Sequence, residues 1–178
     1  MWTSFIGFMA SGKTGVARRL TTVSNRPAVF LDQMITEKAG ISVSEFFAVH
    51  GEAAFRVLEA ETVASLDPER PLVLDTGGGL VQVPEAITLL RERGVVIWLD
   101  APWEILRRRL KESDQETRPL IGRLGWSGLE ELYRRRRRLY AAAADFRLRS
   151  DLGSVDDIAA KAMLRSLQWE RQSGEVRR

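Results

Sequence analysis

The sequence contains no cysteine, one histidine and six prolines among 178 residues. Without cysteine the fold can use neither disulfides nor thiolate metal sites, which suits a reducing cytoplasm. No apolar run approaches the length that a membrane-spanning helix requires. The first residues also show neither a charged leader nor a cleavage site of a secretory signal. We therefore expect a cytoplasmic protein that has no membrane partner.

Basic residues exceed acidic ones by only three, and five arginines stand together at Arg134 to Arg138. A helix would spread five successive residues around its circumference, so this run forms no single basic stripe. We expect most of these arginines to be solvated and one to point inward. Because no zinc-finger, homeodomain or RNA-binding signature accompanies the run, we expect no nucleic-acid partner.

The most informative motif is GFMASGKT at Gly7 to Thr14, which matches G-x-x-x-x-G-K-[ST] and directly follows an apolar run at 2–6. In such a loop, backbone N–H groups surround phosphate oxygens, the lysine reaches the β and γ phosphates, and the hydroxyl ligates Mg²⁺. Ala10 occupies a position where many such loops have another glycine, so we expect a stiffer loop. The expected nucleotide-binding residues in this segment are Ala10, Ser11, Gly12, Lys13, Thr14 and Gly15, and Arg118 is expected to join them from a later segment.

Short β-branched and apolar runs alternate with amphipathic patterns along the chain. The expected strands are 2–6, 28–31, 72–74, 95–99 and 146–149, and the expected helices are 13–23, 44–66, 84–92, 102–111, 129–143 and 155–169. This alternation predicts the α/β class, with a parallel sheet covered by helices on both faces. The length fits one domain spanning 1–178.

Two segments between or beyond these elements have a different character. Residues 113–128 are polar and contain three glycines and Arg118, so we expect a mobile loop there, with a lid over the nucleotide at about 112–125. Residues 172–178 are expected to form a frayed tail.

Ligands of an open parallel sheet collect beyond the carboxyl ends of its strands. Asp32 follows the second expected strand, and Asp75 and the triplet Gly77 to Gly79 follow the third. Five strings at these and later positions carry a resemblance to the shikimate kinases, which extends over nearly the whole chain to about Ala160. They are AVFLDQMITEKAGISVSEFF, HGEAAFRVLEAE, VLDTGGGLV, TRPLI and RRRLYAAAAD. The resemblance implies a three-layer α/β/α sandwich of the nucleoside-monophosphate-kinase type, with a five-stranded parallel sheet in the order 2-3-1-4-5 and a substrate-binding region at about 32–60.

The resemblance also implies roles for individual residues. Asp32 would contact the substrate hydroxyls and act as the candidate base, unless it merely caps the next helix. Arg56 would grip the substrate carboxylate, with Glu59 holding its guanidinium, and a plain surface ion pair is the alternative. Arg136 would be the second arginine on that carboxylate, and Arg118 would close over the phosphates.

The triplet Gly77, Gly78 and Gly79 matches a glycine triplet of the family that brings backbone N–H groups close to the substrate. Side chains at these positions would obstruct that approach, and three adjacent glycines weaken a strand, so a simple turn explains them poorly.

One departure from the family concerns the metal ion. The family usually has a second aspartate two residues before the substrate-binding one, where this chain has Phe30. Asp75 ends an apolar strand at a position where the family often has a small residue. We therefore expect Mg²⁺ to be held by Thr14, with Asp75 as the replacement for the missing carboxylate.

The predicted activity is transfer of the γ-phosphoryl group of ATP to the 3-hydroxyl of shikimate, by a monomer that uses Mg²⁺. Two alternatives remain open at this point. One is a kinase for another hydroxy acid or sugar acid such as gluconate, and the other is an effector-binding protein with little activity.

Overall fold

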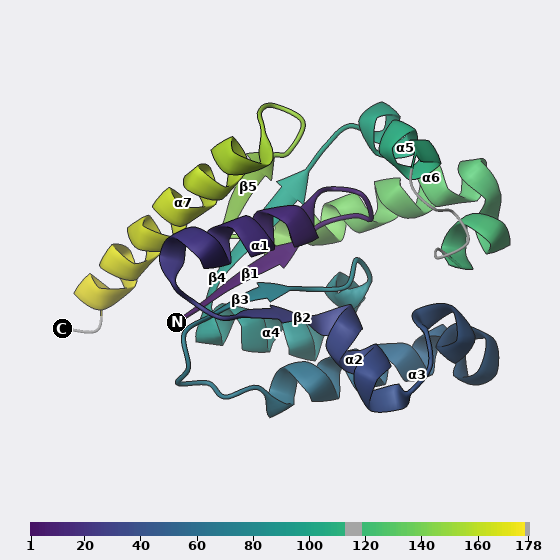
Figure 1. The fold of residues 1–178 in the computed structure, drawn as a ribbon, viewed down its shortest axis with the longest axis horizontal. Helices are drawn as coiled ribbons and strands as arrows, with labels where there is room; N and C mark the ends of the chain where they lie inside the picture. Colours follow the sequence, from purple (N-terminus) through teal and green to yellow (C-terminus); the bar gives the residue numbers. More distant parts are fainter. Residues whose placement is uncertain (113–118, 177–178) are drawn as a thin grey trace.

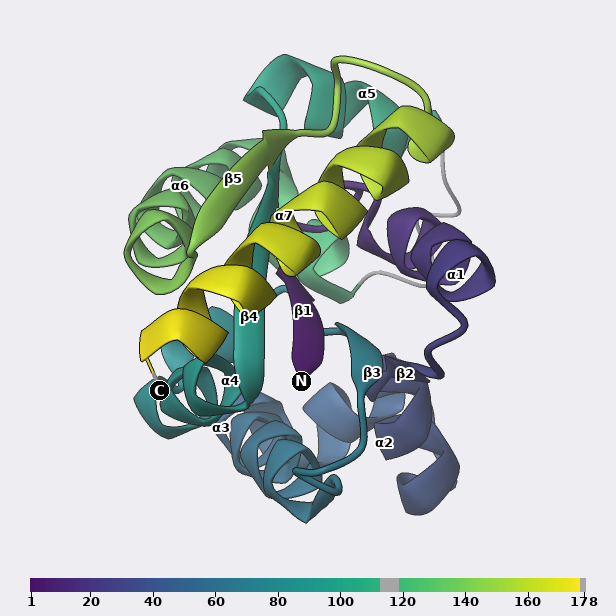
Figure 2. The ribbon, with the colours of Figure 1, turned by 90° about the vertical axis from the view of Figure 1, so that its left-hand side faces the viewer.

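The computed structural model describes residues 1–112 and 119–176. Its centre is a sheet of five strands, β1 (Trp2–Ile6), β2 (Ala28–Phe30), β3 (Leu72–Asp75), β4 (Gly94–Asp100) and β5 (Phe146–Arg149). Their order is β2-β3-β1-β4-β5 and every pairing is parallel. Figure 2 shows the strands side by side in this order. The expected sheet is confirmed, including its order.

Helices cover both faces of the sheet and form the outer two layers (Figure 1). They are α1 (Lys13–Ser24), α2 (Leu31–Ala39), α3 (Val43–Ser65), α4 (Pro84–Arg93), α5 (Trp103–Glu112), α6 (Pro119–Ala143) and α7 (Val155–Val176), with a short 3₁₀ helix η1 (Leu80–Gln82) after β3. Among the described residues, no helix is long and apolar enough to cross a membrane.

The alternation of side chains along β4 creates two separate cores. Val95, Ile97 and Leu99 pack with apolar residues of α1 and α7, whereas Val96 and Trp98 pack with those of α3, α4 and α6. Because successive strand residues point to opposite faces, a sheet covered on both sides needs a continuous apolar strand. All seven residues of β4 are buried accordingly.

Two expectations about helices are wrong. The sequence pattern missed α2, which begins directly after β2 at Leu31. Residues 119–128 were expected to form a loop but belong to α6, whose helix is broken only at Gly125 (φ 62°, ψ −178°). The helix α7 continues to Val176, and the fraying expected for 172–178 stays a prediction.

The carboxyl ends of β1, β2 and β3 meet at the same end of the sheet and lead to the phosphate loop, to α2 and to the glycine triplet. There α2 and α3 lie on one side of the strand ends, and α5 with the beginning of α6 lies on the other (Figure 1). The sequence-predicted site residues therefore gather between these two groups of helices.

Candidate active site

The phosphate loop connects β1 to α1, and its backbone explains the residue types of the motif. Gly12 stands before α1 with φ 90°, a region in which glycine is favoured. A Cβ on Gly7 would lie 2.5 Å from the Leu99 carbonyl oxygen, so no larger residue fits there. Ala10 also has a positive φ of 60°, which is unusual for a residue with a side chain and explains why a glycine is common at this position.

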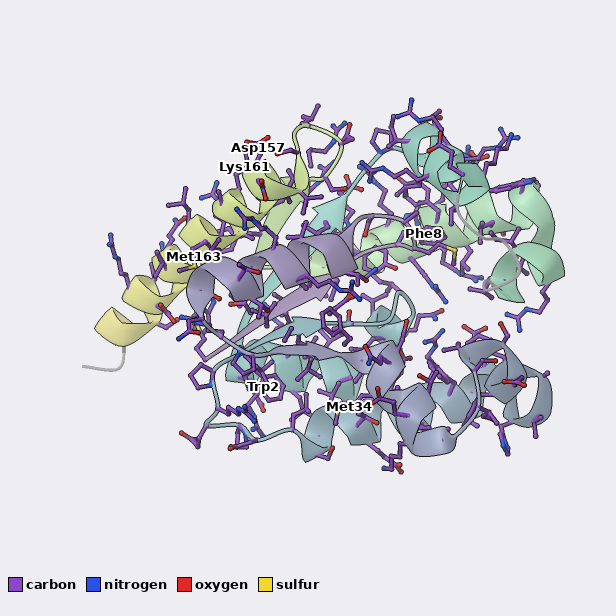
Figure 3. The ribbon with its side chains drawn as sticks, in the orientation of Figure 1. Trp2, Phe8, Met34, Asp157, Lys161 and Met163 are labelled. Carbon is purple, nitrogen blue, oxygen red and sulfur yellow. The ribbon has the colours of Figure 1, made fainter. Side chains whose placement is uncertain are left out.

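Interactions inside the protein hold the loop in place. Lys13 Nζ donates to the carbonyl oxygens of Gly7 at 3.0 Å and Phe8 at 3.3 Å. Phe8, labelled in Figure 3, packs edge-on against Trp103 of α5 and Tyr133 of α6. These contacts fix the loop against the helices that flank the site, as preorganised phosphate binding requires.

A nucleotide-side pocket of about 450 Å³ opens over the loop. Of the seven residues expected to bind the nucleotide, five line it, namely Ala10, Gly12, Lys13, Thr14 and Gly15. Ser11 is instead buried behind the loop, where its N–H donates to the Phe8 carbonyl. Arg109 of α5 lies on the pocket wall and donates to the carbonyl oxygens of Ala10 at 3.2 Å and Ser150 at 3.0 Å. Arg118, the expected lid arginine, lies outside the described residues.

Two carboxylates face this pocket close to Lys13. Thr14 Oγ1 donates to Asp75 Oδ2 at 2.5 Å. Burial raises the pKa of Asp75, opposed by Lys13 and by the Thr14 hydrogen bond. Asp75 of β3 is paired with Phe30 of β2 in the sheet register. The Asp75 carboxylate therefore lies beside the position at which the family usually has its second aspartate.

Asp32 lies in the first turn of α2, with its side chain open to the pocket and protein around its other sides. Desolvation raises the pKa of Asp32, and the nearby charge of Lys13 opposes that rise. The residue at the N-cap position of α2 is Phe30. Among the described residues, no side chain makes a capping hydrogen bond to this helix. The geometry therefore favours a site role for Asp32 over the helix-capping alternative.

A second pocket of about 220 Å³ adjoins the first, and the two share Met9, Asp32 and Gly78 as lining residues. We call it the acceptor pocket. Its polar wall consists of Arg56, Glu59 and Arg136, and its apolar wall includes Phe47 and Phe55. Arg56 forms ion pairs with Glu59 and Glu52 on its own helix, α3. Its guanidinium is mostly buried, so the alternative of a plain surface ion pair is wrong.

Arg136 is the buried member of the arginine run. It is 1% exposed, whereas Arg134 and Arg137 are exposed arginines that pair with Glu130 and Asp100. Its Nη1 donates to the Gly78 carbonyl at 3.3 Å, and Tyr140 Oη, one turn further along α6, donates to the same oxygen at 2.5 Å. This pair of donors anchors the glycine triplet to α6.

The triplet has a structural explanation that the sequence did not reveal. A Cβ on Gly79 would lie 2.0 Å from the Arg56 guanidinium, and a Cβ on Gly77 would lie 2.3 Å from Glu59 Oε1 and 2.6 Å from Asp32 Oδ1. A Cβ on Gly78 would meet its nearest neighbour only at 3.4 Å. Gly77 and Gly79 thus leave room for the polar side chains of the pocket.

Some polar atoms of the pocket have no hydrogen-bond partner within the described protein, namely Arg56 Nε, Arg136 Nε and Glu59 Oε1. Buried polar groups are normally paired, so these atoms indicate capacity for a polar ligand.

Two residues of the site were missed by sequence reasoning. Glu52 contacts both arginines, and only its i,i+4 spacing from Arg56 could have drawn attention to it, whereas nothing in the sequence indicated the bond from Tyr140 to Gly78.

Glu59 allows a prediction about pH and stability. Burial raises the pKa of Glu59 from 4.5 to about 7, against the opposing charge of Arg56. Between these values the native state holds a proton that the unfolded chain has lost, so the free energy of unfolding falls as pH rises through this window. Glu59→Gln should remove that component, which is on the order of 2 kcal/mol. Denaturant unfolding at pH 5 and pH 7.5 measures it, and an equal fall in wild type and variant would contradict it.

Comparisons with known proteins agree with this geometry. The family model described as shikimate kinase matches residues 9–167. The chain is 40% identical over 159 residues to a shikimate kinase of Symbiobacterium thermophilum, covering 89% of this chain and 91% of that one. It is 32% identical over 169 residues to that of Aquifex aeolicus, covering 95% and 97%.

Solved structures give the same result. A shikimate kinase from Acinetobacter baumannii, in complex with shikimate, superposes with a TM-score of 0.85 at 29% identity, covering 94% of this chain and 93% of that one. The Aquifex aeolicus structure gives a TM-score of 0.77 at 31% identity, with 97% and 99% covered. On the matches of sequence, family model and fold, the chain belongs to the shikimate kinase family.

Proposed function

We propose that the protein transfers the γ-phosphoryl group of ATP to the 3-hydroxyl of shikimate, giving shikimate 3-phosphate and ADP, a step of aromatic amino acid biosynthesis. One structural observation supports this function most directly. The pocket over the phosphate loop and the arginine-lined acceptor pocket share Asp32 and Gly78, so donor phosphate and acceptor hydroxyl would meet at Asp32. The two arginines suit a carboxylate on the acceptor.

The residues of the chain divide the work of the reaction. Arg56 and Arg136 bind the acceptor carboxylate, and the carboxylate of Asp32 orients the attacking hydroxyl and accepts its proton as the phosphoryl group moves. Lys13 lies on the phosphate side and balances the charge of the transferring group, a role that we also assign to Arg118. Positioning and charge stabilisation supply most of the catalysis in such reactions.

We further infer a cytoplasmic monomer with one kinase domain over 1–178.

Mg²⁺ fits the residues that face the phosphate loop. Thr14 and Asp75 offer hard oxygen ligands, which this ion prefers. Within the described ranges, no group of three histidine, cysteine or acidic side chains could form an all-protein cage. That composition suits an ion that keeps several waters and is otherwise held by substrate phosphates. When bound, Mg²⁺ would neutralise charge on the phosphate oxygens.

Asp75→Ala should raise the Mg²⁺ concentration that gives half-maximal turnover by about 10- to 100-fold, because residues that orient a metal's ligands or waters typically contribute that much. Titration of Mg²⁺ against turnover at saturating ATP measures the change. Restoring a carboxylate at the neighbouring position, in Phe30→Asp/Asp75→Ala, should recover part of the loss, since Phe30 and Asp75 are partners in register. An unaltered Mg²⁺ dependence of Asp75→Ala would reject this role.

A coupled ADP-release assay tests the proposed function directly. With ATP and Mg²⁺, shikimate should support turnover, whereas gluconate and other hydroxy acids tested in parallel should not. Faster turnover with another acid would identify a different acceptor. Tight binding of an acid without ADP release would instead indicate the effector-binding alternative.

A further inference from the structure

Glu52 contacts three arginines that come from two sides of the site. Its Oε1 accepts from Arg56 Nη2 at 3.0 Å and from Arg136 Nη2 at 3.2 Å, and its Oε2 accepts from Arg123 Nη2 at 2.8 Å. Glu52 and Arg56 belong to α3, whereas Arg123 and Arg136 belong to α6. A single carboxylate therefore spans the two helices that border the acceptor pocket.

These contacts occupy the donors that the proposed function requires. A carboxylate binds best when it receives two charge-assisted hydrogen bonds from a guanidinium fork. One Nη of Arg56 and one Nη of Arg136 are directed at Glu52, and the other Nη of Arg56 pairs with Glu59. An incoming acid must compete with Glu52 for these nitrogen atoms.

We propose that Glu52 is a built-in competitor of the acceptor carboxylate: it holds Arg56 and Arg136 in the ligand-free protein, and the acceptor displaces it from both. The proposal rests on the proposed function in that these two arginines bind an acidic acceptor. It makes Glu52 a residue that sets acceptor affinity without touching the reacting atoms.

Arg123 gives the displaced carboxylate a place to remain. It lies in the short helical segment 119–124, before the break at Gly125, and its side chain is 53% exposed. When the acceptor takes Arg56 and Arg136, Glu52 keeps its bond with Arg123, which limits the cost of displacement. Figure 1 shows the beginning of α6 on the side of the site opposite α2 and α3, so this bond also connects the two sides.

A purely structural role for Glu52 predicts the opposite sign. If Glu52 only positions Arg56 and Arg136, neutralising it should disorder both arginines and weaken acceptor binding. If it competes, the same change leaves the two arginines with less compensating charge and strengthens binding. The direction of the change in affinity therefore separates the two roles.

The experiment measures shikimate binding by isothermal titration calorimetry without nucleotide, for the wild type, Glu52→Gln and Arg123→Gln. We expect Glu52→Gln to bind about tenfold more tightly, since one charge-assisted contact no longer has to be broken. Arg123→Gln should bind about threefold more weakly, as an exposed ion pair contributes little. In the double variant Glu52→Gln/Arg123→Gln, the Arg123 substitution should no longer change the affinity for shikimate. Glu130→Gln removes a comparable ion pair on α6, with Arg134, and serves as the matched control.

A second arm makes the result independent of the identity of the acceptor. Benzoate carries a ring carboxylate but no hydroxyls, and its binding is followed by the rise in melting temperature on titration. If the wild type fails to bind shikimate, the proposed function fails, while tighter benzoate binding by Glu52→Gln still supports the competitor role. Equal, weaker or undetectable binding of both acids by Glu52→Gln overturns it.

Discussion

Asp32→Asn should lower the turnover number by about 10²- to 10⁴-fold, the range that a general base contributes. Asparagine keeps the size and hydrogen-bonding capacity of the side chain but cannot accept the proton of the attacking hydroxyl. The Michaelis constant for shikimate should change much less, because Arg56 and Arg136 remain to bind its carboxylate. Steady-state kinetics with saturating ATP and varied shikimate separates the two effects.

The control for this variant is Glu37→Gln, which changes another carboxylate of α2. Glu37 is exposed, and its one hydrogen bond with a described residue is accepted from Gln33, so its loss should leave turnover unchanged. The wild type should also lose turnover as pH falls through the raised pKa of Asp32. Retention of more than about a tenth of wild-type turnover by Asp32→Asn would exclude the general-base role.

The parts of the fold that follow from local patterns were predictable from sequence. The strands have apolar runs and α1 directly follows the phosphate motif, so both could be read from short windows of residues. The missed helix α2 lacks the usual start signal, because Phe30 rather than a serine, threonine, aspartate or asparagine precedes it. The beginning of α6 was hidden by its glycines, of which Gly125 alone leaves the helical region.

Site residues could be predicted where a local run of sequence indicates their role. They could not be predicted where the role depends on side chains from distant segments that meet in the fold. The run at 134–138 was expected to turn one arginine inward, and the buried one is Arg136. Glu52 is different, because its importance depends on Arg123 and Arg136, which lie 71 and 84 residues away. The register that places Asp75 beside Phe30 is likewise a property of the folded sheet. Such arrangements follow from the tertiary fold, which local patterns do not encode.

Gly79→Ala should raise the Michaelis constant for shikimate by about 30- to 1,000-fold. The added Cβ would lie 2.0 Å from Cζ and Nη2 of Arg56, so the guanidinium would have to leave its position. Losing its charge-assisted bonds with the acceptor should cost about 2 to 4 kcal/mol of binding free energy. Kinetics at saturating ATP measures the change. Gly174→Ala is the control, because a Cβ there meets nothing within 4 Å and Gly174 lies in α7, outside both pockets.

The three positions of the triplet distinguish two explanations of its glycines. If they serve mainly to let backbone N–H groups approach the substrate, alanine at Gly78, between the two pockets, should be at least as damaging as alanine at its neighbours. If Gly77 and Gly79 mainly leave room for Glu59, Asp32 and Arg56, alanine at either of them should be far more damaging than at Gly78, whose nearest contact would be 3.4 Å. We expect the second order. The Michaelis constant for ATP should stay within about twofold in Gly79→Ala, since Arg56 lies on the acceptor side alone. An equally large rise for ATP would mean that the substitution disturbs the whole site.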